Sequence, residues 1–165
     1  MQTLKRLTTE YIDSEDRLRL SAETEDDAIA ILWLTQRLLA RLLVPVFAWL
    51  ERQEGALPRA AVLQHFAQEA AAASLKPQLP VRGIGQTTNW LITSIDVSSD
   101  AEAVHLVFRG PAEQDAKLSL ATHPLRQWLS ILRKQCQKAN WALDVWPSWL
   151  PEAETNTNTS RTRLH

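Results

Sequence analysis

One pattern occurs twice in this sequence: a strand-like segment ends at a threonine, and an apolar helical stripe begins after it. The first copy runs through residues 32–34 to Thr35, and the second runs through residues 118–121 to Thr122. The stripes contain Leu38, Leu39, Leu42 and Leu43 in the first copy, and Leu125, Trp128, Leu129 and Leu132 in the second. The pattern predicts two strand-to-helix transitions, because a threonine hydroxyl can accept a hydrogen bond from a free amide at the start of a helix. An internal duplication and ordinary helix capping both explain the repetition.

The N-terminal half contains three segments with the periodicity of strands. Residues 17–23 alternate between apolar and polar side chains, which places Leu18 and Leu20 on one face of a half-buried strand. A weaker strand over residues 7–12 precedes it. The almost continuous apolar run at residues 28–34 is typical of a central strand that is covered on both faces.

Helical spacing predicts three helices. The first begins after Thr35 and ends at Gly55, and the second spans about residues 58–74. The third spans residues 122–139. The apolar residues that share one face of the second helix are Val62, Leu63, Phe66 and Ala70.

The C-terminal half adds three predicted strands. Residues 89–97 and 103–109 form a hairpin around the turn at residues 98–100, and residues 117–121 form the third strand. The clearest buried face consists of Val104, Leu106 and Phe108. Residues 141–145 alternate again and predict a short edge strand.

The predicted fold is therefore α+β: an antiparallel β-sheet in the order βββ-αα-βββ-α, with the helices packed on the sheet. A two-layered sheet is the alternative that the pattern allows. We expect a single domain over residues 1–150, because neither half has a convincing core alone. A disordered polar tail is expected over residues 151–165. The order of elements resembles that of the head domains of end-joining and centriole scaffold proteins, a likeness of topology that no residue motif carries.

Composition argues against several classes of partner. The formal net charge is −1, so no excess of positive charge indicates nucleic acid or an anionic membrane. The longest apolar stretch, residues 38–50, contains Arg41 and Pro45 and is shorter than the roughly 20 residues that a membrane-spanning helix needs. A single cysteine fits a reducing compartment, and the polar N-terminus lacks the apolar core of a signal peptide. We therefore expect a cytoplasmic protein that binds neither nucleic acid nor membrane.

No group of residues has the spacing of a known catalytic or cofactor site. None of the four histidines is spaced to share a metal with another histidine or with the cysteine. Cys136 and His123 lie about 20 Å apart on one predicted helix, far beyond the reach of proton transfer. The segment Gly83-Ile84-Gly85 lacks the third glycine and the following helix of a dinucleotide site. The sequence therefore indicates neither a cofactor nor a catalytic residue.

Arg37 and Arg41 form the first candidate site. They are spaced i, i+4 at the start of a predicted helix, where they repel each other and oppose the helix dipole. Carboxylates of the acidic turns at residues 13–16 and 25–27 are one compensating partner. An external anion or an acidic partner protein is the other.

The seven tryptophans are the second anomaly. Those that lie on apolar stripes, and are predicted core residues, are Trp33, Trp49 and Trp128. Those that crowd the C-terminal end are Trp141, Trp146 and Trp149. The C-terminal segment either folds back as a lid over the core or forms an exposed aromatic patch that docks a partner.

These features favour a non-catalytic protein-interaction or assembly module, which in one form is a homodimer through the last helix or the tryptophan segment. The alternative is a small-ligand-binding regulatory domain with an aromatic pocket anchored by Arg37 and Arg41. An enzyme of unrecognised type is the second alternative, and the sequence shows no converging acid, base and nucleophile to support it. The residues predicted to bind a partner or an anion are Arg37, Arg41, Trp141, Trp146 and Trp149.

Overall fold

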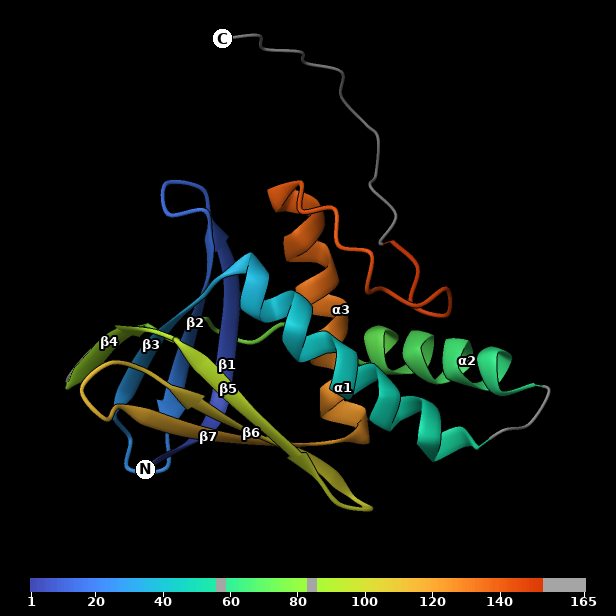
Figure 1. Ribbon diagram of the computed structural model, residues 1–165, viewed down its shortest axis with the longest axis horizontal. Helices are drawn as coiled ribbons and strands as arrows, with labels where there is room; N and C mark the ends of the chain where they lie inside the picture. Colours follow the sequence, from blue (N-terminus) through green and yellow to red (C-terminus); the bar gives the residue numbers. More distant parts are fainter. Residues whose placement is uncertain (56–58, 83–85, 153–165) are drawn as a thin grey trace, which may run out of the picture.

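The computed structural model describes residues 1–55, 59–82 and 86–152. Its strands form a seven-stranded sheet in the order β4-β3-β2-β1-β7-β6-β5, with three helices gathered to one side of it (Figure 1). The strands are β1 (Gln2–Ile12), β2 (Arg17–Thr24), β3 (Ile29–Leu34), β4 (Thr87–Leu91), β5 (Ser94–Ser99), β6 (Ala103–Arg109) and β7 (Asp115–Ala121). The helices are α1 (Gln36–Glu54), α2 (Ala60–Ala73) and α3 (Thr122–Ala139). The fold belongs to the predicted α+β class.

The sheet is mixed, whereas the sequence predicted an antiparallel one. β1 pairs with β7 in parallel at Gln2 and Thr3, and β3 pairs with β4 in parallel. The other neighbouring strands are antiparallel. The predicted strand over residues 89–97 is in fact two strands, β4 and β5, separated by Ile92 and Thr93. The observed order is therefore βββ-αα-ββββ-α. The sequence did not predict the break, because both parts of this segment are extended and their residue pattern is continuous.

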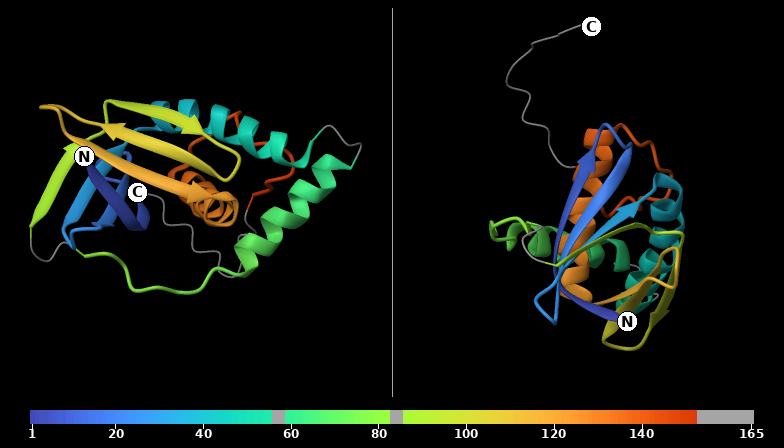
Figure 2. Two further views of the ribbon diagram at one scale, coloured as in Figure 1. Left: turned by 90° about the horizontal axis from the view of Figure 1, so that it is seen from below. Right: turned by 90° about the vertical axis from the view of Figure 1, so that its left-hand side faces the viewer.

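The sheet curls until its two edges approach each other. β4 and β5 lie at opposite ends of the strand order, yet only Ile92 and Thr93 separate them in the chain. In a flat sheet the edge strands would lie about 29 Å apart, at about 4.8 Å per strand, whereas three residue steps span only about 10 Å. The amide of Ile92 donates to the carbonyl of Trp33 (2.9 Å), and the amide of Thr93 donates to the carbonyl of Arg109 (2.8 Å). This corner therefore bonds to both edges, and the two views of Figure 2 show the resulting curl.

Trp90 and Gly110 pack against each other at the junction. Trp90 lies on the edge strand β4 and is buried. Gly110 follows β6, which lies next to the opposite edge strand. A β-carbon added to Gly110 would lie 2.3 Å from Cε3 of the Trp90 ring. The junction therefore requires a residue without a side chain at position 110.

The same topology occurs twice in the chain. The first unit is β1, β2, β3 and α1, and the second is the bent strand β4–β5 followed by β6, β7 and α3. In each unit the start of the first strand pairs in parallel with the third strand of the other unit, and its continuation pairs with its own second strand. The change occurs between Thr3 and Leu4 in β1, just before a register irregularity between Leu4 and Arg6, and at Ile92 and Thr93 in the second unit. The repeated sequence pattern thus corresponds to a repeated topology.

The capping part of that pattern holds only in the first unit. The Thr35 hydroxyl accepts a hydrogen bond from the amide of Leu38 at 3.3 Å, as predicted. α3 begins at Thr122, also as predicted, but Ala121 occupies its N-cap and supplies no side-chain hydrogen bond. α1 ends at Gly55, whose φ of 70° suits a glycine.

One hydrophobic cluster combines buried side chains from both units. The predicted inner faces of β2, β6 and α3 are confirmed at Leu18, Leu20, Ala22, Val104, Leu106, Phe108, Leu125, Leu129 and Leu132. Trp49 and Trp128 are core residues, as predicted. The prediction for Trp33 is wrong: it is half-buried, and its indole nitrogen donates to Asn89 at 2.7 Å. β3 is therefore fully covered on one face only.

The segment after α3 differs from its prediction. Residues 141–145 do not form the predicted edge strand: residues 141–143 are irregular and residues 144–145 form a turn. The amide of Trp141 donates to the carbonyl of Cys136, and that of Leu143 donates to the carbonyl of Trp141. The predicted disordered tail lies outside the described residues, apart from Pro151 and Glu152. No helix in the described ranges is long and apolar enough to cross a membrane.

We expect Gly110→Ala to lower the free energy of unfolding by about 1–3 kcal/mol, because the new methyl group overlaps the ring of buried Trp90. Urea titration measures this loss. Trp90→Leu removes the opposing ring, so Gly110→Ala should cost less in that background. Equal costs in both backgrounds would show that the contact between the two residues does not control the junction.

Candidate interaction surface

α2 turns its apolar face outward. The apolar side chains on its outer face are Val62, Leu63 and Phe66, exposed to 53%, 43% and 62%. The side chains on its inner face are Gln64, Gln68 and Ala71, exposed to 1%, 4% and 0%. An amphipathic helix at a protein surface normally does the reverse. The shared face that the sequence indicates therefore exists, but solvent covers it instead of the core.

Polar contacts hold the inner face of α2 against α1 and α3. Gln64 donates through Nε2 to the carbonyl of Leu50 in α1 (2.6 Å), and its Oε1 accepts a hydrogen bond from Arg126 in α3. Gln68 donates to the carbonyl of Arg126 and to the hydroxyl of Ser130, both at 2.8 Å. These contacts define the glutamine seam, by which we mean Gln64, Gln68, Arg126 and Ser130. They fix the rotation of α2 without using its large apolar residues.

The glutamine seam is polar at a cost in stability. Arg126 is 2% exposed, and its Nε and Nη1 atoms have no hydrogen-bond partner among the described residues. Its guanidinium lies 5.5 Å from the ring centre of Trp149. Burial lowers the pKa of Arg126, an effect that the charge of Glu54 opposes. Each buried polar group without a partner costs about 1–3 kcal/mol, so packing alone does not explain why the apolar face points away.

The C-terminal tryptophans fold back onto the core, which corresponds to the lid alternative. Trp141 and Trp149 are only 7% and 6% exposed, so they do not form an exposed patch. The indole nitrogen of Trp141 donates to Asp16 (3.0 Å), and that of Trp149 donates to Glu51 (3.4 Å). Trp146 is half-buried and lies under the guanidinium of Arg133, 4.8 Å from its ring centre. Binding of a partner by these tryptophans stays a prediction, and it would require the segment to open.

Arg37 and Arg41 lie on the solvent-exposed side of α1. No ion pair to either arginine exists within residues 1–55, 59–82 and 86–152, so the acidic turns do not compensate them. Those turns have other partners: Asp16 accepts hydrogen bonds from Tyr11 and Trp141, and Asp27 pairs with Lys5. Among the described residues, no hydrogen bond or cation–π contact joins either arginine to Trp141, Trp146 or Trp149, whose observed polar contacts include those with Asp16, Arg133 and Glu51. The predicted site residues therefore do not form one polar network.

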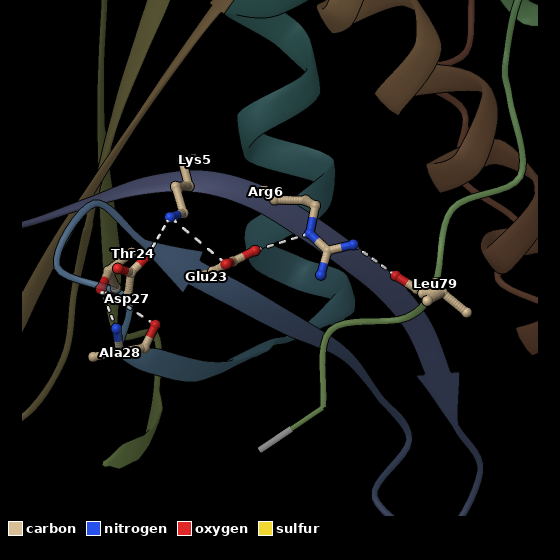
Figure 3. A network of polar contacts seen from close by, with 7 residues as sticks. All are labelled: Lys5, Arg6, Glu23, Thr24, Asp27, Ala28 and Leu79. Atoms are coloured by element: carbon tan, nitrogen blue, oxygen red, sulfur yellow. Dashed lines mark hydrogen bonds and ion pairs between the residues drawn. The ribbon is translucent and has the colours of Figure 1, made fainter. Parts of the chain in front are cut away.

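A groove of about 470 Å³ opens between β1, β7, α3 and residues 74–80, and neither Arg37 nor Arg41 lines it. It forms because β1 and β7 pair only at Gln2 and Thr3 and then diverge. Lys5 and Arg6 line the groove, but Glu23 pairs with both of them, and Asp27 also pairs with Lys5 (Figure 3). These two cations are engaged within the chain, which weakens the groove as an anion site.

Two serine–histidine pairs resemble parts of a catalytic site. His105 contacts Ser119 through Nδ1 and Asp100 through Nε2, both at 2.9 Å, and the second pair is Ser74 with His123 at 3.0 Å. Sequence spacing did not reveal the first group, because cross-strand pairing brings it together. Asp100 also accepts the amides of residues 102 and 103. The first group therefore anchors the turn between β5 and β6, and none of its three residues lines the groove beside β1.

Cys136 is a core residue, as its place in the α3 stripe predicts. It is 1% exposed, and burial raises the pKa of its thiol to about 12. The thiol is therefore protonated at neutral pH and is no nucleophile. Among the described residues, no group of three or more His, Cys, Asp or Glu side chains is arranged to hold a metal ion.

Comparisons of the chain with protein families, with curated proteins and with solved structures find no match. The function of the chain therefore has to be inferred from the arrangement of its own residues.

The Asp100 carboxylate gives a prediction for pH. The hydrogen bond from His105 and those from the two amides lower the pKa of Asp100 to about 2, below the usual value of about 3.9. Because the folded-state pKa is depressed, its contribution to stability is complete above about pH 4 and is lost as the pH falls towards 2. We expect a carboxyl titration midpoint near 2 in an NMR experiment, with Asp100→Asn to assign the signal. A midpoint near 4 would show that the turn does not hold the carboxylate.

Proposed function

We propose that this chain is a non-catalytic protein-interaction module and that α2 presents its docking surface. The observation that carries the proposal is the orientation of α2, which buries two glutamines and exposes Val62, Leu63 and Phe66. We call these three residues, together with Ala70, the apolar face of α2.

The orientation of α2 leaves apolar surface unburied that could stabilise a contact. Burying a Val, Leu or Phe side chain stabilises a protein by about 1.5–3 kcal/mol relative to exposing it. α2 exposes three such side chains on one face, and it also buries polar groups that lack partners. Contiguous exposed apolar patches of this kind mark protein–protein contacts in soluble proteins. A second protein surface that covers the apolar face would recover this energy.

The position of α2 also supports docking. α2 packs on α1 and α3, away from the sheet, so a partner can approach it without disturbing the strands (Figure 1). The glutamine seam fixes the helix by hydrogen bonds, which leaves the outer side chains free to meet a partner. The partner that fits is a protein surface with its own apolar stripe, such as a helix, because α2 offers a row of side chains and not a cavity.

The small-ligand alternative has weaker support. It requires Arg37 and Arg41 to anchor a pocket with aromatic walls, and both arginines lie on the exposed side of α1. The groove beside β1 contains only one aromatic residue, Trp128, among the described residues that line it. Docking through α2 is therefore the function that the side-chain arrangement favours.

Polar substitution separates a docking face from a structural one. We expect Phe66→Gln to change the free energy of unfolding by less than about 0.5 kcal/mol, because the side chain is exposed. Leu43→Gln, at a site 1% exposed in α1, should cost several times more, about 3 kcal/mol, because it buries an amide in the core. Chemical denaturation measures both. Unfolding of the Phe66→Gln variant would mean that the apolar face stabilises the fold and is not reserved for a partner.

A photo-crosslinking amino acid in place of Phe66 tests docking in the native cell. We expect a discrete adduct at position 66 and none at position 44, where Val44 is a matched control because it is an exposed apolar residue (59%) on α1. The mass of the adduct distinguishes a second copy from another protein. Absence of any adduct at position 66 would contradict the proposed function.

A further inference from the structure

The geometry points to a second copy of this chain as the partner of α2: we infer that two α2 helices pair in antiparallel orientation through their apolar faces, around a twofold axis at Phe66. This inference rests on the proposed function and specifies its partner. Three observations support it: the width of the exposed stripe, the order of large and small residues along it, and the charges at its ends.

The exposed stripe is centred on Phe66. At about 100° per residue, the positions within about 60° of Phe66 on the helix are 59, 62, 63, 69, 70 and 73. All of them are exposed. The buried glutamines lie about 160° from Phe66, on the opposite side. The stripe therefore runs straight along the whole helix, as the contact between two helices requires.

Large and small residues are distributed in a way that suits an antiparallel pair. The N-terminal part of the stripe carries Val62 and Leu63, and the C-terminal part carries Ala70 and Ala73. When two copies run in opposite directions about Phe66, Val62 of one copy faces Ala70 of the other, and Leu63 lies level with the turn that carries Glu69 and Ala70. A parallel pair would instead place large residues against large ones and alanines against alanines, which leaves a gap at one end.

The charges at the ends of the stripe also favour the antiparallel pair. Arg59 lies at the N-terminal end of the stripe and Glu69 lies near its C-terminal end, where it is 3.3 Å from His65 of the same helix and its side chain stays 60% exposed. In the antiparallel arrangement, Arg59 of one copy lies within about 6 Å along the axis of Glu69 of the other, about four residues at about 1.5 Å each. The twofold axis generates this pair twice. A parallel arrangement would place Arg59 beside Arg59 and Glu69 beside Glu69.

The twofold geometry closes the assembly at two chains. In such an interface the same patch serves both copies, so no apolar surface of α2 remains to recruit a third. The polar groups of the glutamine seam stay on the far side of each helix and are undisturbed. The inference therefore predicts a dimer and not a filament.

Single cysteines on α2 test this geometry in the full chain. The native Cys136 is 1% exposed, so the unsubstituted protein serves as the background control. Under mild oxidation we expect Phe66→Cys to form a disulfide-linked dimer, because the two positions face each other across the axis. Ala73→Cys is the matched control: its two copies would lie about 21 Å apart in the antiparallel pair and should not link.

The outcomes separate this inference from the proposed function. Linkage at position 66 alone supports the antiparallel pair, and linkage at both positions would indicate a parallel pair and overturn it. No linkage at either position, together with a light-scattering mass of one chain at high concentration, would also overturn it. In that case an adduct with a different protein at position 66 in the cell would leave the proposed function standing.

Charge reversal supplies an independent test. We expect Arg59→Glu to raise the dissociation constant of the dimer roughly tenfold, because the new carboxylate at position 59 of each copy then lies near Glu69 of the other copy. Adding Glu69→Arg should restore affinity, since position 59 then carries the negative charge and position 69 the positive one. Sedimentation equilibrium measures both constants. A double variant as weak as Arg59→Glu alone would contradict the pairing of these two residues.

Discussion

Ile92 and Thr93 join the two edges of the sheet, and the rest of the structure depends on this corner. A sheet of seven strands can have its edges only two residues apart if it curls, and the corner amides bond to β3 on one side and to β6 on the other. The curl brings Trp90 over Gly110, and side chains of the strands, α1 and α3 share one buried cluster. A side chain at position 110 would overlap the Trp90 ring, so the junction would have to shift to accept it.

The proposed docking surface lies where the two repeated units differ. Each unit consists of three strand positions and one helix, and both contribute to the same core. The two units differ after their helices: α2 comes after α1, and the tryptophan segment comes after α3. These two additions meet each other, since His65 of α2 contacts the carbonyl of Trp149 at 3.4 Å. The tryptophan segment buries Trp141 and Trp149, whereas α2 turns its apolar residues outward, so of these two additions α2 is the one that we propose as the docking surface.

Much of the fold could be predicted from the sequence, because the periodicity of apolar residues determines which side chains share a face. The inner faces of β2, β6 and α3 follow from alternation and helical spacing alone. The parallel pairing of β1 with β7 was not readable, because it depends on how the two units meet. The orientation of α2 could not be predicted either. The sequence indicates its apolar stripe, but the acceptors that bind Gln64 and Gln68 belong to α1 and α3, and their positions depend on the fold.

For the predicted site residues too, the sequence indicated the residues but not their surroundings in the fold. The sequence marked Arg37 and Arg41 as a candidate site, but two carboxylates of the acidic turns have other partners: Asp16 accepts from Tyr11 and Trp141, and Asp27 pairs with Lys5. The tryptophan cluster was also visible, but its burial depends on Asp16 and Glu51, which lie far away in the chain. Residue type and spacing thus identified anomalies, and only the fold determined which of them face solvent.

The orientation of α2 is the central claim, and hydroxyl-radical footprinting of the phenylalanines tests it most directly. Phe66 is 62% exposed, whereas Phe47 and Phe108 are 4% and 0% exposed, so residues of one type provide the internal comparison. The account predicts that Phe66 is oxidised much faster than the other two in dilute protein and becomes protected as the protein is concentrated. Oxidation of Phe66 as slow as that of Phe108 at every concentration would show that α2 turns its apolar face to the core, and it would contradict the account.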